Sequence, residues 1–466
     1  SLLRDNTMSD EHHSGLLYGL EQRIPPLPAF FSALQHVLAG LVGIITPPLI
    51  IGATLGLGDW LPYLISMSLL ASGIGTFLQS NRVWGIGAGM ICMQGTSFAF
   101  LGVTVAGGMW VKAQGGGPQD MMAMLFGVNF VAALVPVIVS RFIEPLKKIF
   151  TPIITGSVIA LIGISLIKVS VINWCGGEKA EDFASMSNIA LGAGTLGVIV
   201  LLSCAKNRWL RLSSVVVGIA VGCIAAGLSG QFHLHSLGDT LFRLPTLFPF
   251  GFQFNSAIFL PVALVSLVCI LEAVGDLTAN SLISQQSVDD RAFRNRLKGG
   301  ILADGVSCMV AAMLCAFPNT TFAQNNGVIQ MTGVASRYVG RYIGVILILL
   351  GLFPPVGELL RQIPAPVLGG ATMVMFGCVV AAGIRIITQT PLSRRDVLIV
   401  GLAFGAGLGV ESVPAFLSHF PPMVGDLFGS AATSGGLVAI ALNLILPQEQ
   451  AAMKSLRSQD DRAESV

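Results

Sequence analysis

The chain has 466 residues, of which 53% are hydrophobic and only 11% are charged. Soluble domains carry about 25% charged residues, so this composition excludes a soluble globular protein and predicts a protein that lies mostly within a membrane. The net charge of +2 does not indicate a nucleic-acid-binding surface, and none of the eight cysteines forms a CxxC pair that would indicate a metal site.

Apolar segments follow one another along almost the whole chain. A helix needs about 20 apolar residues to cross the hydrocarbon core of a bilayer, and fourteen segments are candidates. Residues 1–30 are polar, show no cleavable signal peptide and are predicted to be cytoplasmic, as is the tail at 448–466. The first seven candidate spans lie near 31–55, 61–80, 86–108, 121–140, 150–172, 189–205 and 212–228. The second seven lie near 257–281, 301–317, 320–339, 342–360, 366–384, 396–416 and 428–447.

Basic residues alternate between the loops that join these spans. With the N-terminus placed inside, the inside segments hold 21 of the 26 Lys and Arg residues, whereas the outside segments hold only Lys112, Lys179, Arg243 and Arg361. Cytoplasmic loops of membrane proteins collect Lys and Arg. The charge pattern therefore supports fourteen spans with both termini in the cytoplasm.

The two sets of seven spans resemble each other weakly. Gly95–Ala99 in the third span resembles Asn319–Ala323 in the tenth, and the fifth and twelfth spans both open with a Pro-x-x-x-Gly pattern. Because each half has an odd number of spans, matching elements run in opposite directions across the membrane. Transporters are often built from such inverted repeats, with the binding site where the repeats face each other.

The third and tenth spans are unusually polar. The third contains Gln94, Thr96 and Ser97 after a series of glycines, and the tenth follows Pro318 and is rich in Asn, Thr and Gln. Irregular backbone at membrane depth is tolerated only against protein or a wet cavity. We expect two broken segments that meet near the midplane, each presenting the free N–H groups of a half-helix to a ligand.

Three acidic residues, Glu272, Asp276 and Asp304, are assigned to the interior of spans. An acid at mid-bilayer costs about 2.5–3.5 kcal/mol on insertion scales, and such residues usually mark a pathway or a proton relay. Glu272 and Asp276 are four residues apart and share one helix face, which must look inward. The similarity of the two halves lets Gln324 face Glu272 from the tenth span, so we expect a binding site where the two meet. Each acid could instead brace a neighbouring helix, and a lone histidine such as His36 near a helix end is more often structural.

The run from Gln324 to Gly333 resembles the signature of the nucleobase–ascorbate transporter family, also called nucleobase:cation symporter-2: Gln or Glu, then Asn-x-Gly, four residues and Thr. Gln35-His36, the segment Glu272–Asp276 and Lys298-Gly299-Gly300 before Asp304 extend the similarity from about residue 16 to 448. The chain is similar above all to the bacterial xanthine permeases of that family.

The resemblance implies an all-α polytopic membrane protein with fourteen spans in two inverted seven-span repeats, 31–228 and 257–447, and with short strands in the broken spans 3 and 10. It implies a core domain, 31–140 with 257–360, that slides like an elevator against a gate domain, 150–228 with 366–447. It further implies proton-coupled uptake of purine nucleobases across a bacterial cytoplasmic membrane, no cofactor other than the proton, and a homodimer through gate-domain contacts.

The resemblance also assigns roles to residues. Glu272 would bind ring N–H groups of the base, Gln324 would pair with it from the facing repeat, and Asn325 would support the site. Other substrate-binding positions would be Phe98 and Phe322, sandwiching the ring, together with Ser97 and Thr321. Asp304, Asp276 and His36 would serve proton coupling or support. Gln rather than Glu at 324 points to xanthine or urate, and Ser97, where some xanthine-selective relatives carry Asn, leaves the choice between the two open.

Three alternatives to a proton-coupled purine transporter are a different substrate, an enzymatic function and sodium coupling. A transporter of the same architecture could carry uracil or a small anion, although an anion would need a cation at the site and the central side chains are acids and amides. A membrane-embedded enzyme is disfavoured, because the chain has no HExxH, CxxC, Ser/His/Asp or phosphate-loop pattern. Sodium coupling is less favoured than proton coupling, since no additional cage of carboxylates or hydroxyls is evident.

Overall fold

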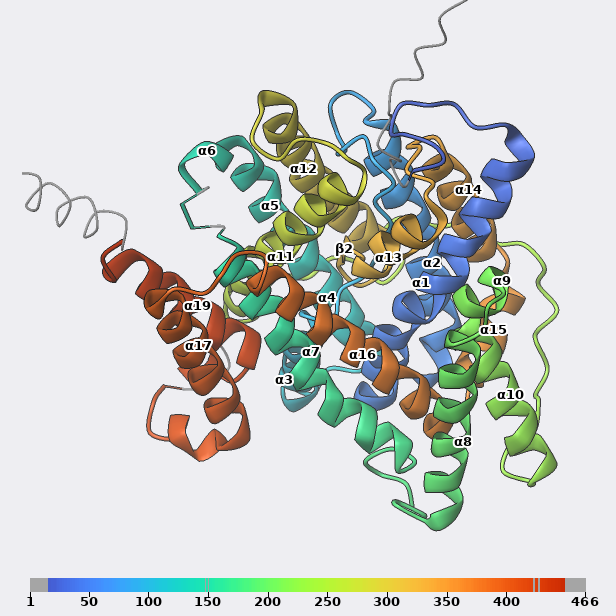
Figure 1. Ribbon diagram of the computed structural model, residues 1–466. Coiled ribbons are helices and arrows are strands. Elements are labelled where there is room, and N and C mark those ends of the chain that lie inside the picture. The colour runs from blue at the N-terminus through green and yellow to red at the C-terminus, as the bar shows by residue number, and fades with distance from the viewer. Residues whose placement is uncertain (1–15, 147, 150, 422–423, 426–427, 449–466) are drawn as a thin grey trace, which may run out of the picture.

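The structure is a computed structural model that describes residues 16–146, 148–149, 151–421, 424–425 and 428–448. Most of the described chain is helical (Figure 1). The first half contains α1 Pro26–Leu55, α2 Leu61–Asn81, β1 Gln94–Thr96, α3 Leu101–Ala113, α4 Pro118–Ala132, α5 Leu134–Val139, α6 Ile143–Leu146, α7 Pro152–Trp174, α8 Met186–Ser203, α9 Arg208–Leu212 and α10 Ser214–Leu228. The second half contains α11 Ser256–Ile283, α12 Arg291–Met313, β2 Asn319–Thr321, α13 Ala323–Thr332, α14 Val339–Leu352, α15 Pro354–Arg361, α16 Ala365–Ile387, α17 Arg394–Ser412 and α19 Ala431–Ile445.

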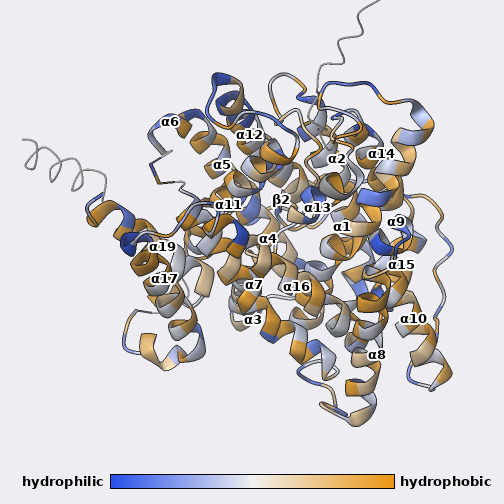
Figure 2. Cartoon of the chain, in the orientation of Figure 1, coloured by the Kyte–Doolittle hydropathy of each residue, from blue (hydrophilic) through white to orange (hydrophobic). Residues whose placement is uncertain are grey.

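Seven helices of the described residues are long and apolar enough to cross a membrane, and an eighth span arises if α14 and α15, which meet at 80°, count as one. Figure 2 shows hydrophobic residues over most helices, with hydrophilic residues at several helix ends and loops, among them those near α6, α12 and α19. Large apolar side chains are exposed on the outer helices, for example Leu201 at 75% and Leu228 at 86%. Such exposure fits a lipid-facing surface. The remaining predicted spans coincide with helices that are short, broken or basic at one end, so the count of fourteen stays a prediction.

Helix α12 extends beyond the ninth predicted span. The ninth span was expected at 301–317, whereas α12 begins at Arg291 and ends at Met313. The Asp290 side chain accepts a hydrogen bond from Phe293 N at 2.8 Å and so caps the helix ten residues earlier. The basic residues expected in a loop therefore lie in the first turns of α12.

The predicted short strands in spans 3 and 10 are confirmed. β1 and β2 pair antiparallel, with Gly95 opposite Thr320, and all six strand residues are buried. Backbone bonds from Ser97 N to Pro318 O (2.8 Å) and from Phe322 N to Met93 O (3.0 Å) extend the pairing at both ends. The two broken segments thus satisfy each other's backbone groups inside the protein, as membrane depth requires.

The helices around the strand pair form two groups. The first group consists of α1, α2, α3, α4, α5, α11, α12, α13 and α14, of which α1, α2, α11 and α12 contact β1 or β2. The second group consists of α7, α8, α10, α16, α17 and α19. Figure 1 shows α17 and α19 at one end of the second group and α8 and α10 at the other. α7 and α16 join these ends and pack closely, because Gly156 lies against the Gly383 carbonyl. The largest apolar core draws residues from both groups.

The polar segment before α1 lies along the chain that follows α13. Leu17 N donates to Gly333 O at 2.7 Å, and Ala335 N donates to Tyr18 O at 2.9 Å. Arg337 also pairs with Glu21 at 3.0 Å. Residues 1–15 of the predicted cytoplasmic segment and 449–466 of the predicted tail lie outside the described residues.

Candidate functional site

The carboxylate of Asp276 ties α11 to the second broken segment. Thr321 Oγ1, at the end of β2, donates to Asp276 Oδ2 at 2.8 Å, and Asn326 Nδ2 of α13 donates to the Asp276 carbonyl oxygen at 3.3 Å. Asp276 is only 6% exposed. Its position therefore depends on strand β2 and helix α13 together, which fits the bracing role weighed for it.

Glu272 lies one helical turn before Asp276 on the same face of α11. Its side chain is half-buried, and its buried Oε2 atom has no hydrogen-bond partner in the described part of the chain. A buried polar atom is normally paired, because an unsatisfied one costs about 1–3 kcal/mol. Glu272 is thus an acceptor that a ligand can use.

Gln324 and Asn325 stand in the first turn of α13, directly after β2. Helix α13 begins without a side-chain cap, so its first N–H groups are available to a ligand. Asn325 Nδ2 instead donates to Ile91 O at 2.6 Å, an acceptor that it shares with Asn280 Nδ2, also at 2.6 Å. Asn325 therefore holds the segment before β1 in place, whereas the half-buried Gln324 side chain makes no hydrogen bond with the described residues.

The two predicted aromatic residues have different surroundings. Phe322 is 5% exposed and fills the space above Gly95 of β1, where an added side chain would collide with its ring. Its ring also lies against Gly43 of α1. Phe98 packs edge-on against Phe376 of α16, with ring centroids 5.1 Å apart and planes at 87°. The ring sandwich remains a prediction, because Phe322 packs inside the protein and Phe98 lines a cavity.

Ser97 and His36 are buried side chains that pack next to other residues of the predicted site. Ser97 is 2% exposed, and its Oγ lies 3.6 Å from Cys269 Sγ of α11. His36 of α1 is 1% exposed and lies beside Asn325. Both of its ring nitrogens lack a hydrogen-bond partner among the residues that the structure describes. These positions agree with roles in shaping the site rather than in covering a ligand.

Asp304 reaches the strand pair from α12. Thr320 Oγ1 donates to Asp304 Oδ2 at 3.5 Å, the long end of the range for a hydrogen bond. The Gln94 amide of β1 lies beside the same carboxylate but makes no hydrogen bond within the described chain. Asp276 and Asp304 thus bond to neighbouring residues of β2, Thr321 and Thr320. No group of three or more His, Cys, Asp or Glu residues within the described ranges could hold a metal ion.

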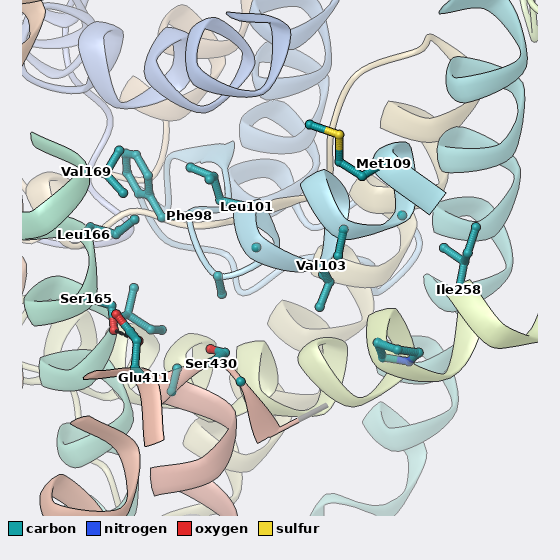
Figure 3. Close-up of a pocket in the computed structure, with 18 of the residues that line it drawn as sticks. Phe98, Leu101, Val103, Met109, Ser165, Leu166, Val169, Ile258, Glu411 and Ser430 are labelled. Carbon is teal, nitrogen blue, oxygen red and sulfur yellow. Dashed lines mark hydrogen bonds between the residues drawn. The ribbon is translucent and has the colours of Figure 1, made fainter. Parts of the chain in front are cut away.

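A cavity of about 760 Å³ lies between the two helix groups. α3 and the start of α11 line one side, and α7, Glu411 of α17 and Ser430 line the other. Figure 3 shows Glu411 beside Ser165, with Val103 and Ile258 farther along the cavity. Phe98 belongs both to this cavity and to the predicted site, whereas Glu272 and Gln324 do not line it.

Glu411 is the residue at this cavity that was missed from the sequence. Its Oε2 atom accepts hydrogen bonds from Ser165 Oγ at 2.7 Å and from the backbone N of Ala431, the first residue of α19, at 3.0 Å. The carboxylate therefore stabilises the N-terminus of α19 as well as lining the cavity. Glu411 falls inside the predicted span 396–416, and its position there was the signal that could have found it.

Comparison with known proteins gives close relatives along nearly the full chain. A model described as "Permease family" (Xan_ur_permease) matches residues 28–416. The xanthine permease XanQ of Escherichia coli (strain K12) is 43% identical over 448 residues, covering 94% of this chain and 96% of XanQ. The xanthine permease XanP of the same strain is 41% identical over 451 residues, covering 95% and 97%. The uric acid permease PucJ of Bacillus subtilis (strain 168) is 33% identical over 424 residues, covering 89% and 92%.

Solved structures share the fold at much lower identity. The transmembrane domain of the cyanobacterial bicarbonate transporter BicA aligns with a TM-score of 0.57 at 15% identity, over 91% of this chain and 99% of that one. The murine anion transporter Slc26a9, in its inward-facing state, aligns with a TM-score of 0.60 at 11% identity, over 91% and 69%. These likenesses show the architecture alone.

The family match and the relatives cover the strand pair, α11, α12 and α13, where the unpaired Glu272 and the Gln324 signature lie. The protein is therefore a multi-pass membrane transporter rather than an enzyme, and it belongs to the nucleobase–ascorbate transporter family.

Proposed function

We propose that this protein imports purine nucleobases, xanthine or urate, together with protons across the bacterial cytoplasmic membrane. The observation that carries the proposal is a pair of polar side chains on adjacent elements. On α11, Glu272 Oε2 has no partner among the described residues, and on α13 the Gln324 amide makes no hydrogen bond with them. Asn326 joins the two helices through its bond to the Asp276 carbonyl oxygen. A purine dione presents several N–H and C=O groups in one plane. A carboxylate accepts from its N–H groups, and an amide both donates and accepts.

The relatives support the choice of substrate. Two are named xanthine permeases and one a uric acid permease, and this chain covers more than nine-tenths of each. Ser97, which stands where some xanthine-selective relatives carry the larger Asn, is buried against Cys269, and the proposal therefore leaves urate open as a substrate beside xanthine.

Alternating access in the proposal comes from movement of the strand-bearing first helix group against the second. The 760 Å³ cavity lies between these groups. Its lining includes residues near the C-terminal end of α3, the start of α11 and the C-terminal end of α17, which all adjoin loops assigned to the outside by the charge pattern. The cavity thus supports a route from outside to Phe98, and an elevator-like movement would carry the site inward. Fourteen spans in two inverted repeats, and a homodimer through the second group, belong to the same proposal.

The coupling proton in this scheme resides on one of the buried acids. Asp276 is held by Thr321, whereas Glu272 Oε2 and Asp304 Oδ1 have no partner within the residues described. The latter two are therefore better placed to exchange a proton as substrate arrives and leaves.

Anion transport is the second candidate, favoured by the bicarbonate and anion transporters that share the fold. An anion site needs a cation or several free donors. In the described chain the side chains bonded around β1 and β2 include two acids, Asp304 and Asp276, with amides and hydroxyls. The first N–H groups of α13 would suit either ligand class, whereas the nearby acids favour a neutral base with N–H donors.

Uptake by intact cells that lack purine transporters tests the proposal. Cells expressing this protein should accumulate labelled xanthine or urate, and a protonophore should abolish accumulation. Labelled uracil, hypoxanthine and bicarbonate measured in parallel define selectivity. Uptake that survives collapse of the proton gradient contradicts proton coupling, and absence of purine uptake contradicts the substrate.

A further inference from the structure

A second, much smaller cavity lies behind strand β2. It has a volume of about 20 Å³ and is enclosed by α4, α11, α12 and the chain entering β2. Most of its wall is apolar, with four polar side chains: Asn129, Ser266, Asp304 and Asn319. A single water molecule needs roughly 10–15 Å³ of such volume, so the cavity has the size of one water site.

Three of the side chains that line this cavity each carry an atom without a hydrogen-bond partner in the described ranges: Asp304 Oδ1, Asn319 Oδ1 and Asn129 Nδ2. Their side chains are deeply buried, at 5%, 1% and 4% exposure. Buried polar atoms in folded proteins are almost always paired with protein or with ordered water. Three such atoms around one small cavity indicate a common polar partner.

Hydrogen bonds to the other polar atoms of Asn319 and Asp304 fix the orientation of these two side chains. Asn319 Nδ2 donates to Ser307 Oγ at 3.0 Å, so its amide oxygen is directed away from that bond. Thr320 Oγ1 donates to the second oxygen of the Asp304 carboxylate. Ser266 Oγ already donates to Val262 O at 3.0 Å.

We propose that this cavity binds one structural water molecule, which accepts a hydrogen bond from Asn129 Nδ2 and donates to Asp304 Oδ1 and Asn319 Oδ1. Water offers two donors and two acceptor positions, so all three protein atoms are satisfied. Asn129 thereby becomes a positioning residue that fixes the Asp304 carboxylate relative to strand β2.

A sodium ion does not suit the same cavity. Hard cations bind a shell of oxygen ligands, whereas this cavity offers two unpaired oxygens and an amide N–H. Rotation of the Asn129 amide would exchange donor for acceptor, and a water molecule pairs with either group. The site therefore links α4, α12 and β2 without a metal.

The water site has a consequence for transport that rests on the proposed function. Asp304 and Thr320 form one hydrogen bond, and β2 leads directly into Gln324 of α13. A fixed Asp304 therefore helps to hold the strand in register beside the substrate. Loss of the water should slow turnover without weakening purine binding, because Asn129 lies behind the strand.

An isosteric pair of variants tests this role. Asn129→Val and Asn129→Thr have the same shape and differ in one hydroxyl. Asn129→Val removes the group that donates to the water, and we expect the water to be lost and Asp304 Oδ1 to be left without a partner. The maximal rate of xanthine uptake should then fall by about 10- to 100-fold with KM unchanged. Asn129→Thr should retain most of the activity, because its hydroxyl restores a partner for the water. Equal activity of the two variants, at equal abundance in the membrane, overturns the proposal.

A direct observation keeps the water site testable apart from the transport assay. An experimental structure of the wild-type protein at a resolution that shows ordered water should contain a peak within hydrogen-bond distance of all three atoms. The peak should persist when sodium is replaced by choline and be lost in Asn129→Val. An empty wild-type cavity, or a peak that requires sodium, refutes the site, whereas absence of uptake with the water present refutes only the proposed function.

Discussion

At the scale of single residues, the site separates acids that are already bonded from acids that are free. Asp276 receives the Thr321 hydroxyl, whereas Glu272 Oε2 and Asp304 Oδ1 have no partner in the described chain. A carboxylate that is expensive to bury and yet unpaired is the expected state of a group that binds a ligand or a proton. We therefore expect Asp276 to brace the structure and Glu272 and Asp304 to bind the ligand or the proton.

Glu272→Gln tests the central assignment. The amide keeps the shape of the side chain but replaces one acceptor oxygen by a donor, which would face purine N–H groups. We expect xanthine uptake to fall to background while the protein reaches the membrane at normal abundance, measured by labelled uptake and by immunoblotting. Glu144→Gln is the control, because Glu144 is 54% exposed and, among the described residues, forms a salt bridge with Arg294 at 3.1 Å. Normal uptake by Glu272→Gln refutes the site.

Thr321→Val tests the bond that holds Asp276. Removing the hydroxyl leaves a buried carboxylate oxygen unsatisfied, so we expect the stability of the purified protein to fall by about 1–3 kcal/mol. Thr278→Val on α11 is the matched control, since the Thr278 hydroxyl donates to the carbonyl of Val274 in its own helix. Thermal unfolding in detergent should separate the two variants, and equal melting temperatures contradict the role given to Thr321.

At the scale of elements, two three-residue strands position the whole site. β1 and β2 come from opposite halves of the chain, and each is followed by a helix, α3 or α13. The Phe322 ring occupies the space that a side chain at Gly95 of β1 would need. The pairing that sets the position of Gln324 thus depends on a residue without a side chain.

Gly95→Ala tests this close packing. The added methyl group collides with the Phe322 ring, and overpacking of this kind costs about 1–3 kcal/mol. We expect reduced purine uptake and a lower melting temperature. Gly194→Ala on α8 provides the comparison, because an added methyl group there meets no atom within 4 Å. A variant at Gly95 that is as stable and active as the one at Gly194 contradicts the packing argument.

At the scale of the whole molecule, the large cavity separates the two helix groups on the side assigned to the outside. Closely packed glycines join α7 and α16 within the second group, and the strand pair is enclosed by the first. The proposed elevator-like movement would shift the strand-bearing first group along the second. The fold shared with BicA and Slc26a9 shows that this architecture recurs in distant transporters.

Accessibility of single cysteines tests this orientation. In a background without the eight native cysteines, Val103→Cys in the cavity should react with a membrane-impermeant maleimide added to intact cells. Trp84→Cys, at a position that is 94% exposed on the predicted cytoplasmic side, should react only in inverted vesicles. Labelling in the opposite pattern reverses the assigned topology.

The sequence by itself determined that the chain lies in a membrane and that two polar segments are broken, and it predicted that Glu272 and Gln324 mark the site. These conclusions rest on local properties: long apolar runs, Lys and Arg in alternate loops, and acids at costly depth. Only the tertiary structure decided which groups meet, as in the bond from Thr321 to Asp276 and the bond from Asn325 to the carbonyl of Ile91, a residue 234 positions away. It also revealed Glu411 at the large cavity and the three polar atoms behind β2. Such contacts join distant parts of the chain through packing, so no local pattern of residues encodes them.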